Sequence, residues 1–542
     1  MEQIVTNNAT KLQLIKISIK TGFLLDSETL GIFEQLYKIH KDFPEIILST
    51  LRVTLPSEKR MLTRELFLSA IENVISTVKN QNTKEIEKAL SFLETLIEEK
   101  SQLKKDKQKE ENHMANIESK KTEKEEEIRN IKILISYNLK SKKFEVEDFV
   151  KYFRNRFNVM KSWLQGKTEL ENLTSINKIS NTKQQFSIIG MINQKRETKN
   201  KNIMLEVEDL TGSAKFIVNS RKEDIFEKAK ELVLDDVVGL RCSGNGEIFF
   251  VEEIVFPDIA LNERRRLEQE EYAAFISDLH VGSARFLEDN FNRFIEWLNG
   301  KLEHKETAKK VKYLLVLGDT VDGVGVYPGQ EELLNIKDIR KQYEKLAELL
   351  KKIREDITIV LCPGQHDAVR VAEPQPSLYT SFNNYTSPLY ELKNLFLVSN
   401  PALVEIGSKE KKSGLKILMY HGASLHSIIN DIDKLRIAKA HENPATVIKY
   451  LLKKRHLAPS HSFTTYLPAE EDSLLIKEVP DVIAIGEMHR PDIEYYNNIL
   501  IINCSCWQSI TPFEEKVGNH PDPCKVPLLN LKTGSTRILD FS

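Results

Sequence analysis

The stretch Phe275-Ile276-Ser277-Asp278-Leu279-His280-Val281-Gly282-Ser283 lies near the middle of the chain. An apolar run over 273–276 is typical of a buried strand, and a carboxylate and an imidazole follow it two residues apart. In an extended chain residues i and i+2 face the same way, so Asp278 and His280 can bind one cation together. Gly282 lets the backbone pass close to a bound group. Alone, this motif also fits a polar strand end.

The pattern recurs four more times, each time after an apolar run. Gly318-Asp319-Thr320-Val321-Asp322 follows the run 314–317, and Gly364-Gln365-His366-Asp367 follows the run 357–361. His421-Gly422 follows the run 417–420, and Gly486-Glu487-Met488-His489 follows the run 482–485. Intervals of about 40–70 residues leave room for a helical connection between neighbouring strands. Because open α/β sheets gather ligand groups at strand ends, these clusters predict one shared site.

The order and spacing of these clusters resemble the calcineurin-like metallophosphoesterase superfamily over about residues 270–510. The stretches 364–370 and 372–376, with His456-Leu457-Ala458-Pro459 and Trp507-Gln508, resemble more closely the small subunits of archaeal family-D DNA polymerases. The resemblance implies an α/β domain of two layered sheets between helices.

The resemblance also implies a two-metal site. One metal ion would be held by Asp278, His280, Asp319 and His489, and the other by Asp319, Gln365, His421 and Glu487. His366, paired with Asp367, would stabilise the phosphate or protonate the leaving group, and Asp322 would support the ligands from behind. Mixed carboxylate, imidazole and amide ligands suit Mn²⁺, Fe²⁺ or Zn²⁺ better than Mg²⁺, and Mn²⁺ is our prediction. Two positions depart from the family pattern, which has Asn in place of Gln365 and His in place of Glu487.

Composition excludes several classes of protein. The chain has 542 residues and a formal net charge of −2, so contacts with nucleic acid must come from local basic patches. No apolar run reaches the ~18 residues that a membrane span needs, and the N-terminus lacks a signal pattern. Five cysteines in so long a chain indicate a reducing compartment, and we expect a cytoplasmic protein.

Periodicity divides the chain into four parts. Residues 1–80 are predicted to be a helical module, and residues 81–143 a charged tether without a sustained heptad seam. Residues 144–260 combine an aromatic-rich amphipathic helix with short strands over 186–251 that fit an OB-type barrel. The aromatic stripe is best explained as core packing, although Arg154, Arg156 and Lys161 around it would also suit a nucleic-acid backbone. Residues 261–542 form the predicted phosphoesterase-like domain, after a basic joint at Arg264-Arg265-Arg266.

The function that the resemblance implies is that of the small subunit of a heteromeric replicative DNA polymerase with a two-metal 3′–5′ exonuclease for proofreading. Its partners would be a large catalytic subunit, the 3′ end of DNA and, through the complex, a sliding clamp. One alternative is a structural subunit whose metal site is vestigial. Another is an independent metallophosphodiesterase, which the attached barrel and the tethered module argue against.

Overall fold

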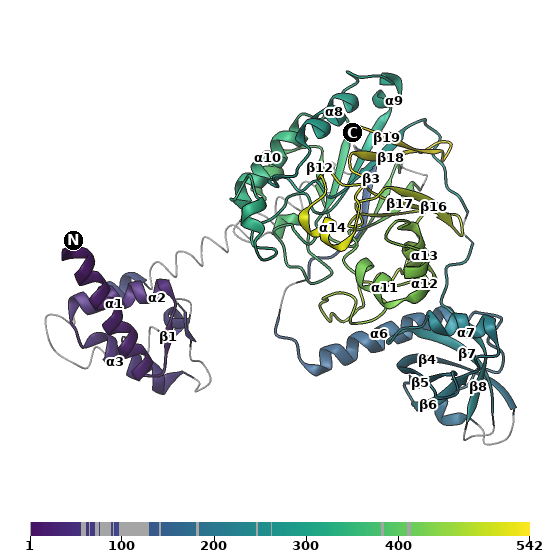
Figure 1. Cartoon of the computed structure of the whole chain (residues 1–542), viewed down its shortest axis with the longest axis horizontal. Coiled ribbons are helices and arrows are strands. Elements are labelled where there is room, and N and C mark those ends of the chain that lie inside the picture. Colours follow the sequence, from purple (N-terminus) through teal and green to yellow (C-terminus); the bar gives the residue numbers. More distant parts are fainter. Residues whose placement is uncertain are drawn as a thin grey trace. The chain divides into compact units, whose positions relative to one another are not determined.

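The computed structural model describes residues 2–55, 61–63, 66–70, 75, 88–89, 91–96, 129–139, 142–179, 184–244, 248–261, 263–380, 384–408 and 413–542. The chain forms two compact units, Met1–Lys121 and Thr122–Ser542 (Figure 1). In the described part of the chain no helix combines the length and the apolar character needed to cross a bilayer.

The N-terminal unit is helical in its described part. It contains α1 (Glu2–Lys20), α2 (Ser27–Ile39) and α3 (Phe43–Thr54), with a short parallel pair of strands, β1 (Leu24–Leu25) and β2 (Met61–Leu62). Asp26 caps α2 by accepting a hydrogen bond from the Thr29 backbone N–H at 2.7 Å. Phe33, Leu36 and Leu48 lie in the buried core of this unit. Most of the predicted charged tether lies outside the described residues.

A closed five-stranded barrel follows helix α6 (Val146–Leu164), as the sequence predicted. Its strands are paired in the order β4-β5-β6-β8-β7, with bounds β4 (Gln184–Glu197), β5 (Ile203–Asp209), β6 (Gly212–Val218), β7 (Val237–Gly244) and β8 (Phe249–Val255). The short η1 (Ile176–Lys178) precedes the barrel, and α7 (Glu223–Lys230) lies between the third and fourth strands. Alternate residues of the strands, such as Phe186, Leu205 and Val251, fill the interior.

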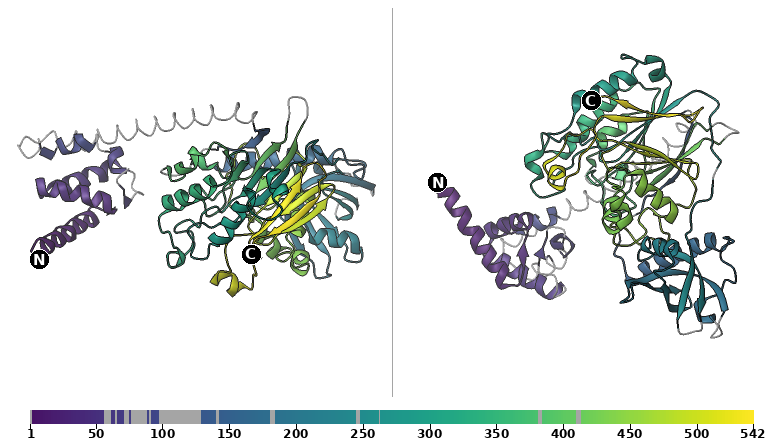
Figure 2. Two further views of the ribbon diagram at one scale, coloured as in Figure 1. Left: turned by 90° about the horizontal axis from the view of Figure 1, so that it is seen from above. Right: turned by 45° about the vertical axis from the view of Figure 1, so that its right-hand side comes forward.

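Two six-stranded sheets form the core of the C-terminal domain. The first has the order β12-β11-β10-β9-β18-β19, with bounds β9 (Tyr272–Ile276), β10 (Val311–Leu317), β11 (Thr358–Cys362), β12 (Leu395–Leu397), β18 (Lys525–Asn530) and β19 (Thr536–Asp540). The second has the order β16-β17-β15-β14-β13-β3, with bounds β3 (Ile131–Ser136), β13 (Ala402–Ile406), β14 (Leu415–Tyr420), β15 (Val482–Ile485), β16 (Asp492–Tyr496) and β17 (Ile499–Asn503). The C-terminal strands β18 and β19, yellow in Figure 2, therefore lie beside strands from the middle of the chain.

Each sheet is buried on both faces, which explains the continuous apolar runs of the central strands. Leu315 of β10 and Met419 of β14 belong to an apolar cluster shared by the two sheets. The other face of the first sheet packs against α8 (Glu288–Leu298) and α10 (Ile339–Lys351), and that of the second against α11 (Leu425–Asp431) and α13 (Ala445–Lys454) (Figure 1). Shorter helical segments complete the domain: α9 (Lys305–Lys309), η2 (Gln330–Leu333), η3 (Leu378–Thr380), η5 (Ser387–Glu391), α12 (Asp433–Ile437) and α14 (Pro512–Val517).

The predicted tether over 81–143 does not extend to residue 143. Residues 131–136 form β3, the edge strand of the second sheet, and pair antiparallel with β13. Ile131 is 2% exposed in the core between the sheets. The three isoleucines of this segment suit a strand, but its partner lies more than two hundred residues further on. The boundary was therefore wrong at its C-terminal end.

Ionic contacts hold α6 and the barrel against the C-terminal domain. Arg156 of α6 is 1% exposed, and its Nε lies 2.7 Å from Asp472 Oδ2. Glu231, after α7, forms ion pairs with Lys434 at 2.6 Å and with Lys453 at 2.5 Å. Arg156 is thus part of an internal contact and does not face solvent, where a nucleic-acid backbone would bind.

Candidate metal centre

The structure brings the predicted site residues together at the carboxyl ends of five strands. Asp278 and His280 follow β9, Asp319 and Asp322 follow β10, and Gln365, His366 and Asp367 follow β11. His421 follows β14, while Glu487 and His489 follow β15. The first three strands are neighbours in one sheet and the last two in the other, so both sheets contribute to one site.

The side chains form three overlapping groups of metal-ligand type. Donor atoms of Asp278, His280 and His489 lie within 4.8 Å of one another, and so do those of Asp278, Asp319, His421 and Glu487. His421 Nε2 lies 3.3 Å from Asp319 Oδ2 and 3.1 Å from Glu487 Oε2. A third group joins His280 to Asp322 and His366, so Asp278 and His280 each belong to two groups, whereas Asp319 belongs to one. Gln365 Nε2 donates a hydrogen bond to Glu487 Oε2 at 2.9 Å, so its amide nitrogen, and not the oxygen that could ligate an ion, faces this carboxylate.

Several of these donor atoms are buried and form no hydrogen bond among the described residues, although most of them lie 3.1–3.4 Å from a carboxylate or imidazole atom of the same site. They are Asp278 Oδ1, His421 Nε2 and both ring nitrogens of His280. Asp278 and His421 are 0% exposed and His280 is 4% exposed. Buried polar atoms without partners are costly in a folded protein, and a cation is the ligand that carboxylate oxygens and imidazole nitrogens would share. The donor set therefore fits divalent metal ions.

Hydrogen bonds behind the histidines fix which ring nitrogen faces the site. Nδ1 of His421 lies 2.7 Å from the Leu317 carbonyl oxygen, and Nδ1 of His489 lies 2.8 Å from Glu514 Oε1. Carbonyl and carboxylate oxygens only accept, so Nδ1 carries a proton in both rings. Nε2 is thereby left to ligate an ion, and the tautomer is set by the residues behind the site.

Glycines next to the donors are required for close approach. A Cβ at Gly364 would lie 2.2 Å from Asp319 Oδ1 and 2.8 Å from His421 Nε2. A Cβ at Gly318 would lie 2.6 Å from His421 Nδ1. These distances are shorter than any real contact, so only glycine can occupy these positions while the donors stay in place.

The backbone adopts the left-handed conformation at five predicted ligands. Their φ angles are between 47° and 67°, and the residues are Asp278, His280, Asp319, Glu487 and His489. This conformation costs a residue with a Cβ of order 1 kcal/mol, and such strain concentrates at functional sites. The turns at the strand ends thus aim the side chains at one another at an energetic cost that packing elsewhere must offset.

Electrostatics keep the carboxylates ionised despite their burial. Burial raises the pKa of Asp278, but the neighbouring His489 and His421 lower it more, so that it lies below its usual value. The same balance lowers the pKa of Asp319, through His421 and His366. Burial lowers the pKa of His421, and Asp319 and Glu487 raise it well above its usual value. The centre therefore attracts positive charge strongly, and a bound cation would displace the imidazole protons.

Asp367 does not pair with His366, contrary to the sequence-based interpretation. Its carboxylate accepts hydrogen bonds from the Thr320 hydroxyl, the Gly364 N–H at 2.9 Å and the Tyr343 hydroxyl at 3.0 Å. Nδ1 of His366 lies instead 2.7 Å from the Asp322 carbonyl oxygen. The backbone of Asp322 therefore holds the His366 tautomer, and Asp367 fixes the turn around the site.

The structure also places residues at the site that sequence reasoning missed. Glu514 contacts His489, and His426 Nε2 lies 3.6 Å from Glu487 Oε1. Asp322 Oδ1 lies 3.1 Å from His280 Nδ1 and also accepts a hydrogen bond from Gln508 Nε2 at 3.3 Å. Thr511 and Glu514 form a capping box that the sequence displays, but nothing local indicated that this Glu reaches His489.

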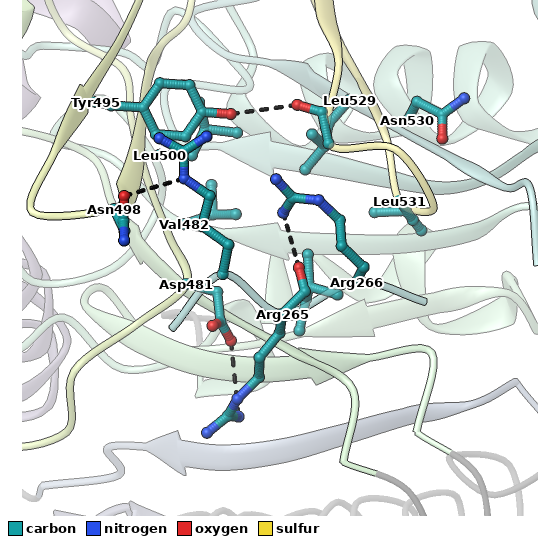
Figure 3. A pocket seen from close by; sticks show the side chains of 13 residues that line it. Arg265, Arg266, Asp481, Val482, Tyr495, Asn498, Leu500, Leu529, Asn530 and Leu531 are labelled. Carbon is teal, nitrogen blue, oxygen red and sulfur yellow. Dashed lines mark hydrogen bonds and ion pairs between the residues drawn. The ribbon is translucent and has the colours of Figure 1, made fainter. Parts of the chain in front are cut away.

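A separate pocket lies at the opposite ends of the strands, where β14 and β15 begin (Figure 3). The Arg264 guanidinium lies over the Tyr495 ring at 4.4 Å from its centroid, and Arg265 is 3.7 Å from Asp481. Arg266 donates to the Thr533 carbonyl oxygen at 3.1 Å. These arginines join the start of the domain to its C-terminal strands, so the predicted basic joint has a structural role in this pocket.

Comparison with known proteins identifies relatives of the chain. A family model that describes the B subunits of DNA polymerases alpha and epsilon matches residues 273–494. A DNA polymerase II small subunit of Methanothermobacter thermautotrophicus is 38% identical over 402 residues, which cover 73% of this chain and 80% of the relative. The protein of the same description from Pyrococcus furiosus is 38% identical, covering 77% of this chain and 68% of the relative. The protein of the same description from Archaeoglobus fulgidus is 37% identical, covering 70% of this chain and 74% of the relative.

Proposed function

The chain belongs to the family of archaeal DNA polymerase II (family-D) small subunits, and we propose that its metal centre is a 3′–5′ exonuclease site that serves proofreading. As the small subunit of a replicative polymerase, the chain implies a large catalytic subunit as its partner. The DNA 3′ end as substrate, and a sliding clamp reached through the complex, belong to the proposal.

The observation that supports the proposal best is the convergence of buried carboxylate and imidazole donors, several of which form no hydrogen bond among the described residues. A subunit with only a structural role has no reason to keep carboxylate and imidazole atoms buried without partners, because each such atom destabilises the fold by about 1–3 kcal/mol. We assign Asp278, His280, Asp319 and His489 to one ion and Asp319, Gln365, His421 and Glu487 to the other. Two divalent cations, Mn²⁺ above all, would supply Lewis-acid stabilisation for hydrolysis of a phosphodiester.

The chain's own residues would orient the phosphate and move the proton. His366 is one-fifth exposed at its side chain, and its Nε2 lies 3.9 Å from Asp319 Oδ2. Because the Asp322 carbonyl keeps a proton on Nδ1, Nε2 is the nitrogen that faces the centre. A protonated Nε2 can donate to a phosphoryl oxygen or to the departing 3′ oxygen. Buried Asp322 in turn orients His280.

The test compares Asp319→Ala with the wild-type chain, each co-expressed with the large subunit and assayed on 3′-labelled DNA with Mn²⁺. We expect the substitution to abolish release of 3′-terminal nucleotides while the complex and its melting temperature stay the same. Asp289→Ala, at an exposed position of α8, is the matched control and should retain activity. Mn²⁺-dependent cleavage that persists in Asp319→Ala would refute the assignment, and a wild-type complex without any cleavage would favour a purely structural subunit.

A further inference from the structure

A short loop beside His366 exposes apolar side chains to solvent. Between Gly323 and Gly329, Val324 is 47% exposed, Val326 is 41% exposed and Tyr327 is 39% exposed. Large apolar side chains next to a polar, buried site are not needed for the core of the domain. Such a local apolar surface is typical of a place where a ligand or partner binds.

Buried amide side chains hold this loop in place. Gln330 is 1% exposed, and it donates to the Asp322 carbonyl oxygen at 2.7 Å and accepts from the Val326 N–H at 2.9 Å. Gln342 is 0% exposed, and it accepts from the Gly323 N–H at 2.9 Å and donates to the Gly323 carbonyl oxygen at 3.0 Å. The valines and the tyrosine are therefore presented on a fixed backbone that is directly tied to Asp322.

Aromatic rings lead from the buried donors to this loop. The His280 and His366 rings are 4.9 Å apart at their centroids, and the His366 and Tyr327 rings are 6.2 Å apart, both in edge-to-face arrangements. A Cβ at Gly323 would lie 2.5 Å from the His366 carbonyl oxygen and 2.7 Å from Val326 Cγ2. The apolar loop thus borders the residue that would handle the scissile phosphate.

We propose that Tyr327, with Val324 and Val326, forms a nucleobase-binding subsite that receives the 3′-terminal base of the DNA strand. The inference rests on the proposed exonuclease function. A terminal nucleotide whose phosphate lies at the metal centre carries its base to the border of the centre, where the Tyr327 ring lies. Every base has a π face, so stacking on an aromatic ring flanked by valines accepts all four bases, as removal of any terminal nucleotide requires.

The experiment is a double-mutant cycle that combines removal of the tyrosine ring with removal of the terminal DNA base. The full-length chain is titrated in Mn²⁺ with fluorescent single-stranded DNA whose 3′-terminal linkage is a non-hydrolysable phosphodiester analogue and whose 3′ end carries either a normal or an abasic nucleotide. Tyr327→Ala should weaken binding of the normal end by about 5- to 150-fold, and binding of the abasic end by less than about twofold. Tyr327→Phe should bind as the wild type does. Phe250→Ala, which removes a similarly exposed ring from β8 of the barrel (43% exposed), is the matched control and should leave the preference for a normal end unchanged.

Three results would overturn the inference. The first is equal weakening of both DNAs in Tyr327→Ala, and the second is no weakening of either. The third is loss of the large subunit in a pull-down with DNA binding unchanged, which would show that the loop contacts protein. The experiment distinguishes the base subsite from the exonuclease function. A wild-type complex that prefers the normal end but does not cleave with Mn²⁺ would refute the exonuclease function and still support the base subsite.

Discussion

Glu514 offers the sharpest test of how the proposed metal centre is organised. Its Oε1 lies 2.8 Å from His489 Nδ1, while its Oε2 accepts hydrogen bonds from the Thr511 N–H and hydroxyl, both at 2.8 Å. One carboxylate thus caps α14 and fixes the His489 tautomer. Burial raises the pKa of Glu514, but the hydrogen bond from His489 and the charge of His489 lower it more. The pKa of Glu514 therefore lies below its usual value, and the group is ionised.

Glu514→Gln leaves one oxygen for both tasks. If the amide oxygen caps α14, the NH₂ group faces Nδ1 of His489, which must then accept, and the ring proton moves to Nε2, the nitrogen that would ligate. If the oxygen stays with His489, the charge that strengthens the hydrogen bond is lost and the cap weakens. Partners of this kind contribute 10–100-fold to metal affinity, about 1.4–2.7 kcal/mol. We expect Mn²⁺ affinity to fall within this range.

Isothermal titration of the full-length chain with Mn²⁺ measures the effect without reference to activity. Glu515→Gln is the matched control, because Glu515 is exposed in the same helical turn and should leave the affinity unchanged. The melting temperature should fall only slightly in Glu514→Gln, since loss of a cap costs about 1 kcal/mol. Equal Mn²⁺ affinities in the two variants would show that Glu514 does not act on the metal centre through His489.

Three further predictions concern Glu487, the edge strand and the α6 contact. Glu487→His should shift metal preference toward softer ions and Glu487→Ala should weaken binding, and identical titrations of these variants and the wild type would exclude Glu487 as a ligand. Deleting residues 1–128 should preserve pull-down of the large subunit. Deleting residues 1–140 removes β3 and should lower the melting temperature. Loss of large-subunit binding in the shorter deletion would contradict the prediction that the N-terminal unit is dispensable for this contact. Asp472→Asn should cost about 3–5 kcal/mol in urea unfolding, because it leaves the buried Arg156 charge uncompensated. Burial raises the pKa of Asp472, but Arg156 and His456 lower it more, so that it lies below the usual 3.8. The stability that the wild type gains from this pair is therefore complete above about pH 4 and should fall below that pH. Asp472→Asn should not show this pH-dependent loss.

The central strands, and the order of the polar clusters that follow them, were predictable from the polarity of their side chains. A parallel strand covered on both faces must be apolar throughout, and its end must be polar where the chain leaves the core. The runs 314–317 and 482–485 were recognised in this way, and they lie in β10 and β15. The barrel was predictable for a related reason, since its interior and exterior residues alternate along each strand.

Contacts that depend on distant parts of the chain were not predictable. Strand β3 has the composition of a strand, but it is stable only beside β13, far away in the sequence. The adjacency of His366 and Asp367 indicated a pair, yet neighbouring residues at a turn point in different directions, and Asp367 turns inward to Tyr343. Glu514 lies in the capping box of α14, and its contact with His489 depends on where β15 places that histidine.

The backbone conformations of the proposed ligands explain why the candidate site was recognisable in the sequence. Left-handed backbone at five non-glycine residues costs of order 5 kcal/mol in total, a large part of the stability of a typical domain. Glycines at positions 318, 364 and 486 then become necessary, because a Cβ at any of them would lie 3.0 Å or less from neighbouring atoms of the site. A fold can retain such strain only if the two sheets pack well enough to offset it or if bound ions stabilise the native state. The need for glycine beside the strained turns therefore explains why the polar clusters are flanked by glycine in the sequence.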